Sequence, residues 1–379
     1  MIPLSVPNVS ETEQQAVARA LESGWVSTAG PDVGEFERRI AALSQVRHCV
    51  ALNSGSAALQ LAMVALGAGP NDFVICPNLA FVATANAVSL AGAEPIFIDT
   101  APDNPQISLD LLEEFLQTQS ELRDGQCYFL GTDRRIRAIM PVHVLGDFCD
   151  MDRLLALARS RGIPVVEDAA AALGASHDGR PAGSMGLIGT LSFNGNKILT
   201  TGGGGAVLSN DARLAEHVRH LARQAKSFPV EYLHDAVGFN YGMPNLNAAL
   251  GLGQLTRLPE FWARKQAIRA QYEAGFAGLN GLRLAPQGDL KRQCGHWLNA
   301  VFTSGARQLE ACLEANGIQT RKLWVPMNRL PMYAQNLYYH REDHSHRWYE
   351  ESVCLPSSTG LTADDLAFVI QRVVDFFGE

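Results

Sequence analysis

The sequence predicts an α/β fold in which a largely parallel sheet is covered by helices on both faces. Two observations support this prediction. Short apolar runs of the kind that form buried strands alternate with helical segments through the first half of the chain, and strand–helix–strand repeats of this kind place neighbouring strands parallel. In addition, 379 residues are too many for one small core, so a second, smaller domain is expected beside the first.

The elements of the larger domain follow in order. The first helix is predicted over 11–24, because Ser10 can cap it, acidic residues occupy its first turn and Gly24 ends it. Further helices are predicted at 56–67, 81–92 and 150–162. Buried strands are predicted at 49–53, 73–77, 94–99, 138–144, 163–168 and 189–193.

The pattern changes near residue 250. Residues 247–279 read as one long amphipathic helix, and the β signals beyond it (RLAP, HWLNAVF and QTRKLWVP) are weak. The chain closes with a helix over 362–379 that Thr362 caps. We therefore expect a large α/β domain over residues 1–245 and a small α+β domain over 246–379 that begins with a long linking helix.

Composition excludes several classes of protein. The formal net charge of -8 and the lack of a basic stripe argue against binding to nucleic acid or a membrane surface. The N-terminal residues do not resemble a signal peptide, and no apolar stretch is long enough to cross a bilayer. Seven scattered cysteines without CxxC spacing favour a reduced, cytoplasmic protein, and the histidine spacing predicts no metal site.

The turn Asn53-Ser54-Gly55-Ser56-Ala57 lies between a predicted strand and a predicted helix. Backbone N–H groups at such a helix start can bind a phosphate, because they point outward at the positive end of the helix dipole. An ordinary N-cap serine is the alternative interpretation. The later run TTGGGG (200–205) lacks the order of a P-loop, and no GxGxxG follows the first strand, which argues against nucleotide hydrolysis and against an NAD-dependent oxidoreductase.

Lys197 is conspicuous because the chain has only five lysines, the first of them at this position, against twenty-six arginines. A buried amine can form a Schiff base with a carbonyl compound, which an arginine cannot do. The alternative interpretation of Lys197 is a solvated lysine in a polar loop. Asp168 ends the apolar strand IPVVED, where it can pair with a cationic ring nitrogen or cap the next helix, while Glu167 faces the other way and is the weaker candidate.

Seven stretches of the chain carry a more specific signal: SGWVSTAGPDVGEFERRIA, ALNSGSAALQLAMVALG, FVATANAVSLAGAEPIFID, VVEDAAAALGA, SFNGNK, GFNYGMPNLNAALGLGQL and IQTRKLWVPMNRLPMY. Over nearly its whole length the chain resembles the DegT-type nucleotide-sugar aminotransferases. This resemblance implies the fold type I of enzymes that use pyridoxal 5'-phosphate (PLP), similar to aspartate aminotransferase. Within the family, the sequence most resembles the branch that acts on C4 of UDP-linked 4-keto-6-deoxy N-acetylhexosamines.

By position, the resemblance implies that Lys197 forms a Schiff base with PLP and moves protons as general acid and base. Asp168 would keep the pyridine nitrogen protonated, and Phe81 would lie against the ring. The resemblance also implies a set of phosphate ligands, in which Asn240 acts from the second subunit of a homodimer: Gly55, Ser56, Ser192 and Asn240. Trp25 and Arg321 fall in segments that, by the same resemblance, line the nucleotide-sugar side.

Three positions depart from the usual pattern of the family. Ala171 stands where glutamine is frequent, Gly242 where arginine is usual, and Asn328 where histidine is frequent. A cofactor contact from the side chain at 171 is therefore missing, and we leave Asn328 out of the catalytic set. Lys197 and Asp168 are unaffected, and a lysine at 197 argues for transamination, because related dehydratases have histidine there.

The implied reaction is a transamination in which glutamate donates its amino group to a keto carbon of a nucleotide-linked sugar. The first expectation is C4 of a UDP-linked N-acetylated 4-keto-6-deoxy hexose, in glycan biosynthesis of the bacillosamine or legionaminic acid kind. A GDP-linked 4-keto sugar, giving perosamine, is the alternative. A regulator that binds PLP or a sugar nucleotide without catalysis is the alternative from another class, since a fold alone does not prove activity.

Overall fold

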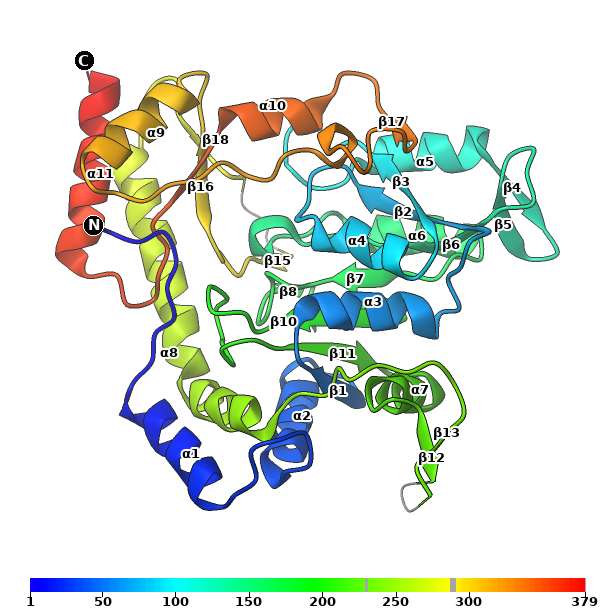
Figure 1. The fold of residues 1–379 in the computed structure, drawn as a ribbon. Coiled ribbons are helices and arrows are strands. Elements are labelled where there is room, and N and C mark those ends of the chain that lie inside the picture. Colours follow the sequence, from blue (N-terminus) through cyan, green and yellow to red (C-terminus); the bar gives the residue numbers. More distant parts are fainter. Residues whose placement is uncertain (229–230, 287–290, 379) are drawn as a thin grey trace.

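The computed structural model describes residues 1–228, 231–286 and 291–378 (Figure 1). Its centre is a sheet made of two hydrogen-bonded sets of strands. In the order β17-β3-β2-β6-β5-β4, the first set comprises β2 (Asp72–Pro77), β3 (Glu94–Ile98), β4 (Ser120–Arg123), β5 (Gln126–Phe129), β6 (Arg135–Ile139) and β17 (Tyr338–Tyr339). In the order β1-β11-β10-β7, the second comprises β1 (His48–Leu52), β7 (Val166–Asp168), β10 (Ile188–Ser192) and β11 (Gly205–Ser209).

The two sets join where β6 meets β7. Isolated parallel bridges link Ile139 to Val165 and Val142 to Asp168. The pairs β17–β3, β3–β2, β2–β6 and β7–β10 are all parallel, whereas β11 is antiparallel to both β1 and β10, and β4 and β5 form an antiparallel hairpin. The predicted α/β class with a mostly parallel sheet is therefore confirmed.

Helices cover both faces of this sheet (Figure 1). They are α1 (Glu11–Glu22), α2 (Pro31–Leu43), α3 (Gly55–Ala65), α4 (Ala83–Leu90), α5 (Leu109–Thr118), α6 (Met151–Ser160), α7 (Ala212–Ala222), α8 (Asn245–Phe276), α9 (Ala306–Ala315), α10 (His344–Glu351) and α11 (Ala363–Gly378). Strand residues alternate between two cores: Ile75 packs with Phe36 of α2, whereas its neighbour Val74 packs with Leu61 of α3. Both faces of the sheet are thus buried, as parallel strands require.

Most predicted elements lie within a few residues of their expected bounds, with α1 capped by Ser10 and Glu13 as a capping box. One strand prediction is wrong in its extent, and one weak β signal does not give a strand. The strand expected over 138–144 ends at Ile139, because Pro141 cannot donate to a ladder and a tight turn with Leu145 at φ 60° follows. The segment QTRKLWVP forms only an isolated bridge between Arg321 and Cys354. The sequence-based prediction also lacks α2, α5, α7, α9 and α10.

The C-terminal part contains a separate three-stranded sheet. It consists of β14 (Arg283–Leu284), β16 (Asn299–Phe302) and β18 (Ser352–Leu355), and it packs with α9, α11 and the end of α8 around a third core. Some pairings cross the expected boundary at 245, since β17 joins β3 and β15 (Arg292–Gln293) joins β8 (Ser176–His177). The division into residues 1–245 and 246–379 stays a prediction, and Glu379 lies outside the described residues.

Helix α8 is 32 residues long and runs from α1 and α2 at its start to α11 near its end (Figure 1). Pro259 lies inside it. The ammonium or amine of Lys265, on the same helix, is fully buried and donates hydrogen bonds to the carbonyls of Trp297 (2.7 Å) and Ser357 (2.5 Å). Helix α8 therefore fixes the backbone next to Trp297, a residue of the site described below.

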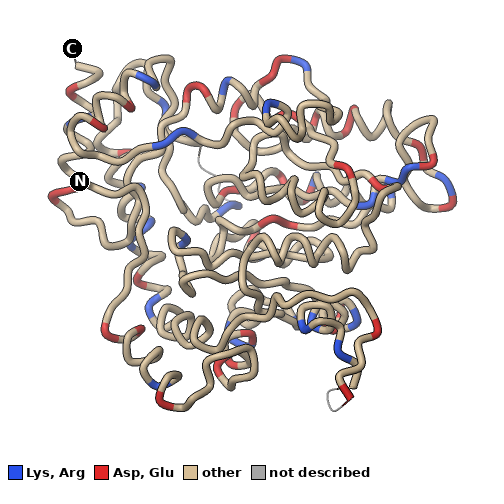
Figure 2. Tube along the Cα trace, viewed as in Figure 1, with Lys and Arg blue, Asp and Glu red and all other residues tan. Residues whose placement is uncertain are grey.

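Charged residues of both signs are distributed over the whole chain. Lys and Arg alternate with Asp and Glu along the chain (Figure 2), and several of them form ion pairs such as Arg134–Glu94 at 2.7 Å. A hairpin of β12 (Lys226–Phe228) and β13 (Leu233–His234) extends away from the body of the molecule (Figure 1). Among the helices of the described ranges, none is both long and apolar enough to cross a membrane.

Candidate active site

A cavity of about 310 Å³ opens where β7 and β10 end and α3 begins. This is the edge at which open α/β sheets bind their ligands. Its walls contain seven of the residues predicted for the site, namely Gly55, Ser56, Phe81, Asp168, Ser192, Lys197 and Arg321. The structure therefore brings together side chains that are separated by up to 266 positions in the sequence.

The start of α3 forms one wall of the cavity. Ser54 is the N-cap, and its hydroxyl accepts a hydrogen bond from the N–H of Ala57 at 3.0 Å. Gly55 packs directly against Ser192, so that a Cβ added at Gly55 would lie 2.8 Å from the Cβ of Ser192. The N-cap interpretation of Ser54 is thus confirmed, and the positive end of the helix still faces the cavity, where it can attract an anion.

Asp168 is buried at the end of β7, with its carboxylate in the cavity wall. Its Oδ2 accepts a hydrogen bond of 2.7 Å from Thr84, and its Oδ1 accepts one of 3.1 Å from the N–H of Ala170. A turn, not a helix, follows Asp168, so helix capping does not account for it. Glu167 turns to the other side of the strand, as expected, and accepts hydrogen bonds from the backbone of residues 183, 185 and 186.

Lys197 lies in the loop between β10 and β11, with its side chain partly buried in the cavity. The pKa of its amine is lowered to about 8. Burial is the largest cause, the charge of Arg321 acts in the same direction, and the attraction of Asp168 opposes both. The solvated-lysine alternative is therefore wrong. An amine with this pKa is partly unprotonated near neutral pH and can attack a carbonyl carbon.

Two tryptophans and an arginine from the C-terminal part close the cavity. The rings of Trp297 and Trp324 stack with centroids 6.2 Å apart, and the Arg321 guanidinium lies 5.5 Å from the centroid of Trp297. Phe81, at the start of α4, stays 55% exposed at the rim. Aromatic faces and a cation at the mouth of a cavity suit a ligand that combines flat or apolar parts with negative charge.

Sequence reasoning missed three residues of the cavity wall: His143, Trp297 and Trp324. His143 is fully buried, and its Nε2 donates to the carboxylate of Glu167 at 2.9 Å. All three lie outside the helices and strands of the structure, so periodicity gave no sign of them. Their only signal was the residue type, because tryptophan and histidine are uncommon in loops without a packing or binding role.

Trp25 and Asn240 do not line the cavity of the single chain. Trp25 is 53% exposed, and its carbonyl accepts a hydrogen bond from Asn245 at the start of α8. Asn240 is exposed beyond the β12–β13 hairpin, with its carbonyl 3.3 Å from Nδ2 of Asn53. Since Asn240 is expected to act on a second subunit, its role stays a prediction, as does that of Trp25.

The three departures have different surroundings. Ala171 lines the cavity, so the place of a polar side chain is taken by a methyl group. Gly242 bridges Leu52, and a Cβ added there would lie 3.3 Å from Cγ2 of Thr28. Asn328 and Asn78 bind each other through two hydrogen bonds of 2.9 and 3.0 Å, so Asn328 has a structural partner.

The donor set of the cavity fits PLP. That cofactor has an aldehyde, a basic ring nitrogen and a phosphate, and the cavity offers an amine of lowered pKa, a buried carboxylate and a helix N-terminus for them. Beside Ser192 there is no room for a side chain at Gly55, so the start of α3 faces the cavity with its backbone at this position. Which atom of the cofactor each residue contacts stays a prediction.

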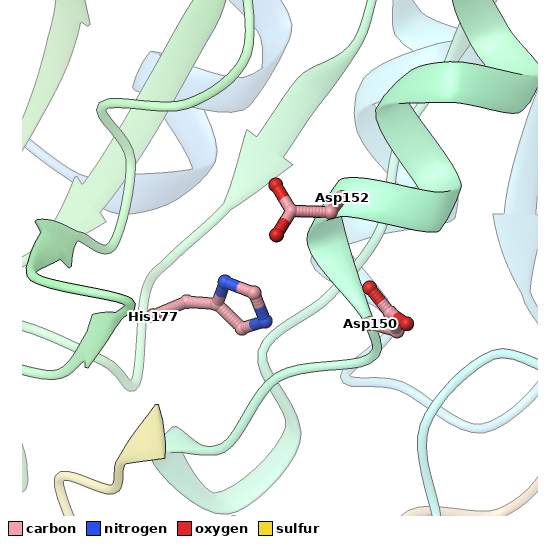
Figure 3. Close-up of side chains that lie close together, drawn as sticks. All are labelled: Asp150, Asp152 and His177. Atoms are coloured by element: carbon pink, nitrogen blue, oxygen red, sulfur yellow. The ribbon is translucent and has the colours of Figure 1, made fainter. Parts of the chain in front are cut away.

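One further group of polar side chains was considered as a metal site. In the described part of the chain, Asp150, Asp152 and His177 bring possible ligand atoms within 4.8 Å of one another beside a second hollow of about 490 Å³ (Figure 3). Asp150 caps α6, however, and the guanidinium of Arg180 lies 2.6 Å from Asp152 and 3.2 Å from Nδ1 of His177. A positive charge already occupies the group, and the expected lack of a metal site stays a prediction.

Comparison with known proteins gives the family. The model of the DegT/DnrJ/EryC1/StrS aminotransferase family matches residues 7–374. The GDP-perosamine synthase of Caulobacter vibrioides is 35% identical over 97% of this chain and 96% of that protein. Among solved structures, S. venezuelae DesV superposes with a TM-score of 0.89 at 32% identity, covering 99% of each chain. Spr1654 of Streptococcus pneumoniae, solved in a PLP form, superposes with a TM-score of 0.87 at 26% identity over 98% of this chain and 97% of its own.

These findings confirm the predicted fold type I architecture, the cofactor and the class of enzyme. The protein is a PLP-dependent aminotransferase. The cavity around Lys197 and Asp168 is where that chemistry is predicted to take place, since its wall combines an amine of lowered pKa with a buried carboxylate and the N-terminus of α3. Because the family model matches nearly the whole length, this chain belongs to the DegT/DnrJ/EryC1/StrS aminotransferase family.

Proposed function

We propose that this chain transfers an amino group from glutamate to C4 of a nucleotide-linked 4-keto-6-deoxy sugar. The observation that carries the proposal is the position of Lys197, whose amine of lowered pKa shares a cavity with Asp168 and with the N-terminus of α3. When bound, PLP supplies an electron sink that stabilises negative charge on the carbon that gains or loses the amino group.

The roles of the residues follow from their chemistry. Lys197 binds the cofactor aldehyde and moves a proton to and from the reacting carbon, a task for a base with a pKa near the working pH. With PLP bound, Asp168 would hold a proton on the ring nitrogen, and Phe81 would lie against the ring. The first turn of α3, with Gly55 and Ser56, binds the phosphate together with Ser192.

We further propose that the active unit is a homodimer. Asn240 of one subunit would complete the phosphate site of the other, and Trp25 with Arg321 would contact the nucleotide sugar. Mixing two inactive variants, Lys197→Ala and Asn240→Ala, tests the dimer, because each mixed dimer would regain one intact site. Recovery of activity on mixing supports the shared site, whereas two variants that stay inactive, or a fully active Asn240→Ala protein, would contradict it.

Two nucleotide sugars are the candidates for the acceptor. The resemblance of the sequence to one branch of the family favours a UDP-linked N-acetylated hexose, of the bacillosamine or legionaminic acid kind. A GDP-linked 4-keto sugar is the second candidate, and it is favoured by the Caulobacter vibrioides relative, a GDP-perosamine synthase. None of the described residues of the cavity wall is assigned to the nucleotide base, so an assay with both substrates decides between the two candidates.

The test has two stages. The absorbance spectrum of the PLP-loaded protein is recorded with and without glutamate, beside Lys197→Ala. We expect glutamate to bleach the yellow band of the wild type and to leave the variant unchanged. The protein, whose cofactor now carries the amino group, is then mixed with a UDP-linked or a GDP-linked 4-keto sugar. Return of the yellow absorbance band identifies the sugar that accepts the amino group. A wild-type spectrum that does not respond to glutamate would instead support a binding protein without catalysis.

A further inference from the structure

The amine of Lys197 lies on the face of a buried indole. Its Nζ is 3.8 Å from the ring centroid of Trp297, and Trp297 is only 3% exposed. An ammonium within about 6 Å of an aromatic face is attracted by the ring quadrupole, and the attraction is strongest where water is excluded. The contact joins the lysine loop of the large sheet to the C-terminal part of the chain.

Trp297 is itself fixed by three hydrogen bonds and one ring stack. Its indole Nε1–H donates a hydrogen bond of 2.6 Å to the carbonyl of Asn196, the residue before Lys197. Its own carbonyl accepts from the buried Lys265, and its backbone N–H donates to Leu145. One face of the ring stacks on Trp324. A side chain fixed so firmly can define where a flexible lysine rests.

We propose that Trp297 is a positioning residue that holds the Lys197 amine over the cavity, through the face of its indole, whenever that amine is not bound to the cofactor. The inference rests on the proposed function, in which Lys197 carries PLP and is released when the cofactor takes up the amino group. An unbound lysine has four rotatable bonds, and the indole keeps its amine beside the reacting carbon for the proton transfer that follows.

The charges around the Lys197 amine explain what the Trp297 ring contributes. Burial and Arg321 disfavour the ammonium, whereas Asp168 favours it. Arg321 also lies on Trp297, 5.5 Å from the same ring centroid. The indole of Trp297 therefore lies within cation–π distance of both Lys197 and Arg321, and its negative face offsets part of the repulsion between these two cations.

The test measures the pKa of Lys197 in the cofactor-free full-length chain. An amine-directed acylating reagent is applied at pH 6 to 10, and mass spectrometry quantifies label on Lys197 apart from the other four lysines. The wild type should give a midpoint near 8. Trp297→Leu should lower the midpoint by about one unit, the size of a buried cation–π contact, and Trp297→Phe by less. Trp324→Leu, on the same wall but off the amine, should not lower it.

An unchanged or raised midpoint in Trp297→Leu would overturn the proposal. If that variant does not fold, the indole emission of the wild type provides the second readout. A change of emission with a midpoint near pH 8 that is lost in Lys197→Met supports the contact, and the same titration in both proteins overturns it. Neither measurement needs a substrate, so failure of the proposed transamination would be seen separately.

Discussion

The hydroxyl of Thr84 donates a hydrogen bond of 2.7 Å to Oδ2 of Asp168, and both side chains are buried. Thr84 belongs to α4 and Asp168 ends β7, so the contact fixes the carboxylate relative to a helix that begins beside Phe81. The other oxygen of the carboxylate is held by the N–H of Ala170. Its orientation is therefore set before any ligand binds.

Replacing Thr84 by valine keeps the volume of the side chain and removes the donor. Because a buried acceptor then loses a partner, we expect kcat to fall about tenfold and the affinity for PLP to weaken. Steady-state kinetics and a PLP titration measure both. Thr84→Ser is the matched control and should restore wild-type values within about twofold; equal kinetics for the valine variant would contradict the prediction.

The pKa of Lys197, about 8, sets a pH dependence on cofactor attachment. Below that pH the amine is protonated and has no lone pair for the aldehyde, so the rate of PLP attachment should rise about tenfold per pH unit up to 8 and level off above it. Stopped-flow absorbance on the cofactor-free protein measures the rate. Lys197→Arg should show no covalent attachment at any pH, and a wild-type rate independent of pH would contradict the assignment.

Gly55 is expected to tolerate no side chain. A Cβ there would lie 2.8 Å from the Cβ and 3.0 Å from the Oγ of Ser192, so the serine must move away from the start of α3. We expect Gly55→Ala to weaken binding of PLP by roughly tenfold or more, because the phosphate wall is deformed. Gly34→Ala is the control, since a Cβ at Gly34 meets nothing within 4 Å, and its PLP affinity should equal that of the wild type.

Lys265 should make the protein more stable at alkaline pH. Burial lowers the pKa of its amine from 10.5 to about 7 in the folded state. Between those values the unfolded chain binds the additional proton, so the free energy of unfolding rises with pH, by up to about 1.4 kcal/mol per unit from this group. Denaturant unfolding at pH 7 to 10 should show a smaller rise for Lys265→Met, and equal slopes for both proteins would refute this.

The sequence was sufficient for β1, β2, β3, β7 and β10 of the central sheet and for residues at their ends, but it did not predict β4, β5, β11 or β17. Asp168 and Lys197 stood out because a carboxylate ends an apolar strand and because lysine is rare in this chain. Gly55 and Ser56 could be named because a glycine–serine turn at a helix start leaves backbone N–H groups free for an anion, although an ordinary N-cap has the same local sequence. Such local signals need no knowledge of the tertiary fold.

Residues whose role depends on long-range contact could not be found in the same way. Trp297 reaches Lys197 from 100 positions away, by a loop before β16 that has no periodicity. The weak β signal of QTRKLWVP corresponds to a single isolated bridge, between Arg321 and Cys354. Asn240 and Trp25 were named only by resemblance, and both lie outside the cavity of the single chain, so their roles stay predictions.

Helix α8 has a mechanical consequence. A helix of 32 residues is about 48 Å long and bends little over most of its length. Pro259 interrupts its hydrogen bonds near the middle and gives it one point of easy bending. Because Lys265 lies beyond that point and donates a hydrogen bond to the carbonyl of Trp297, any bend at Pro259 would change the position of the indole relative to Lys197.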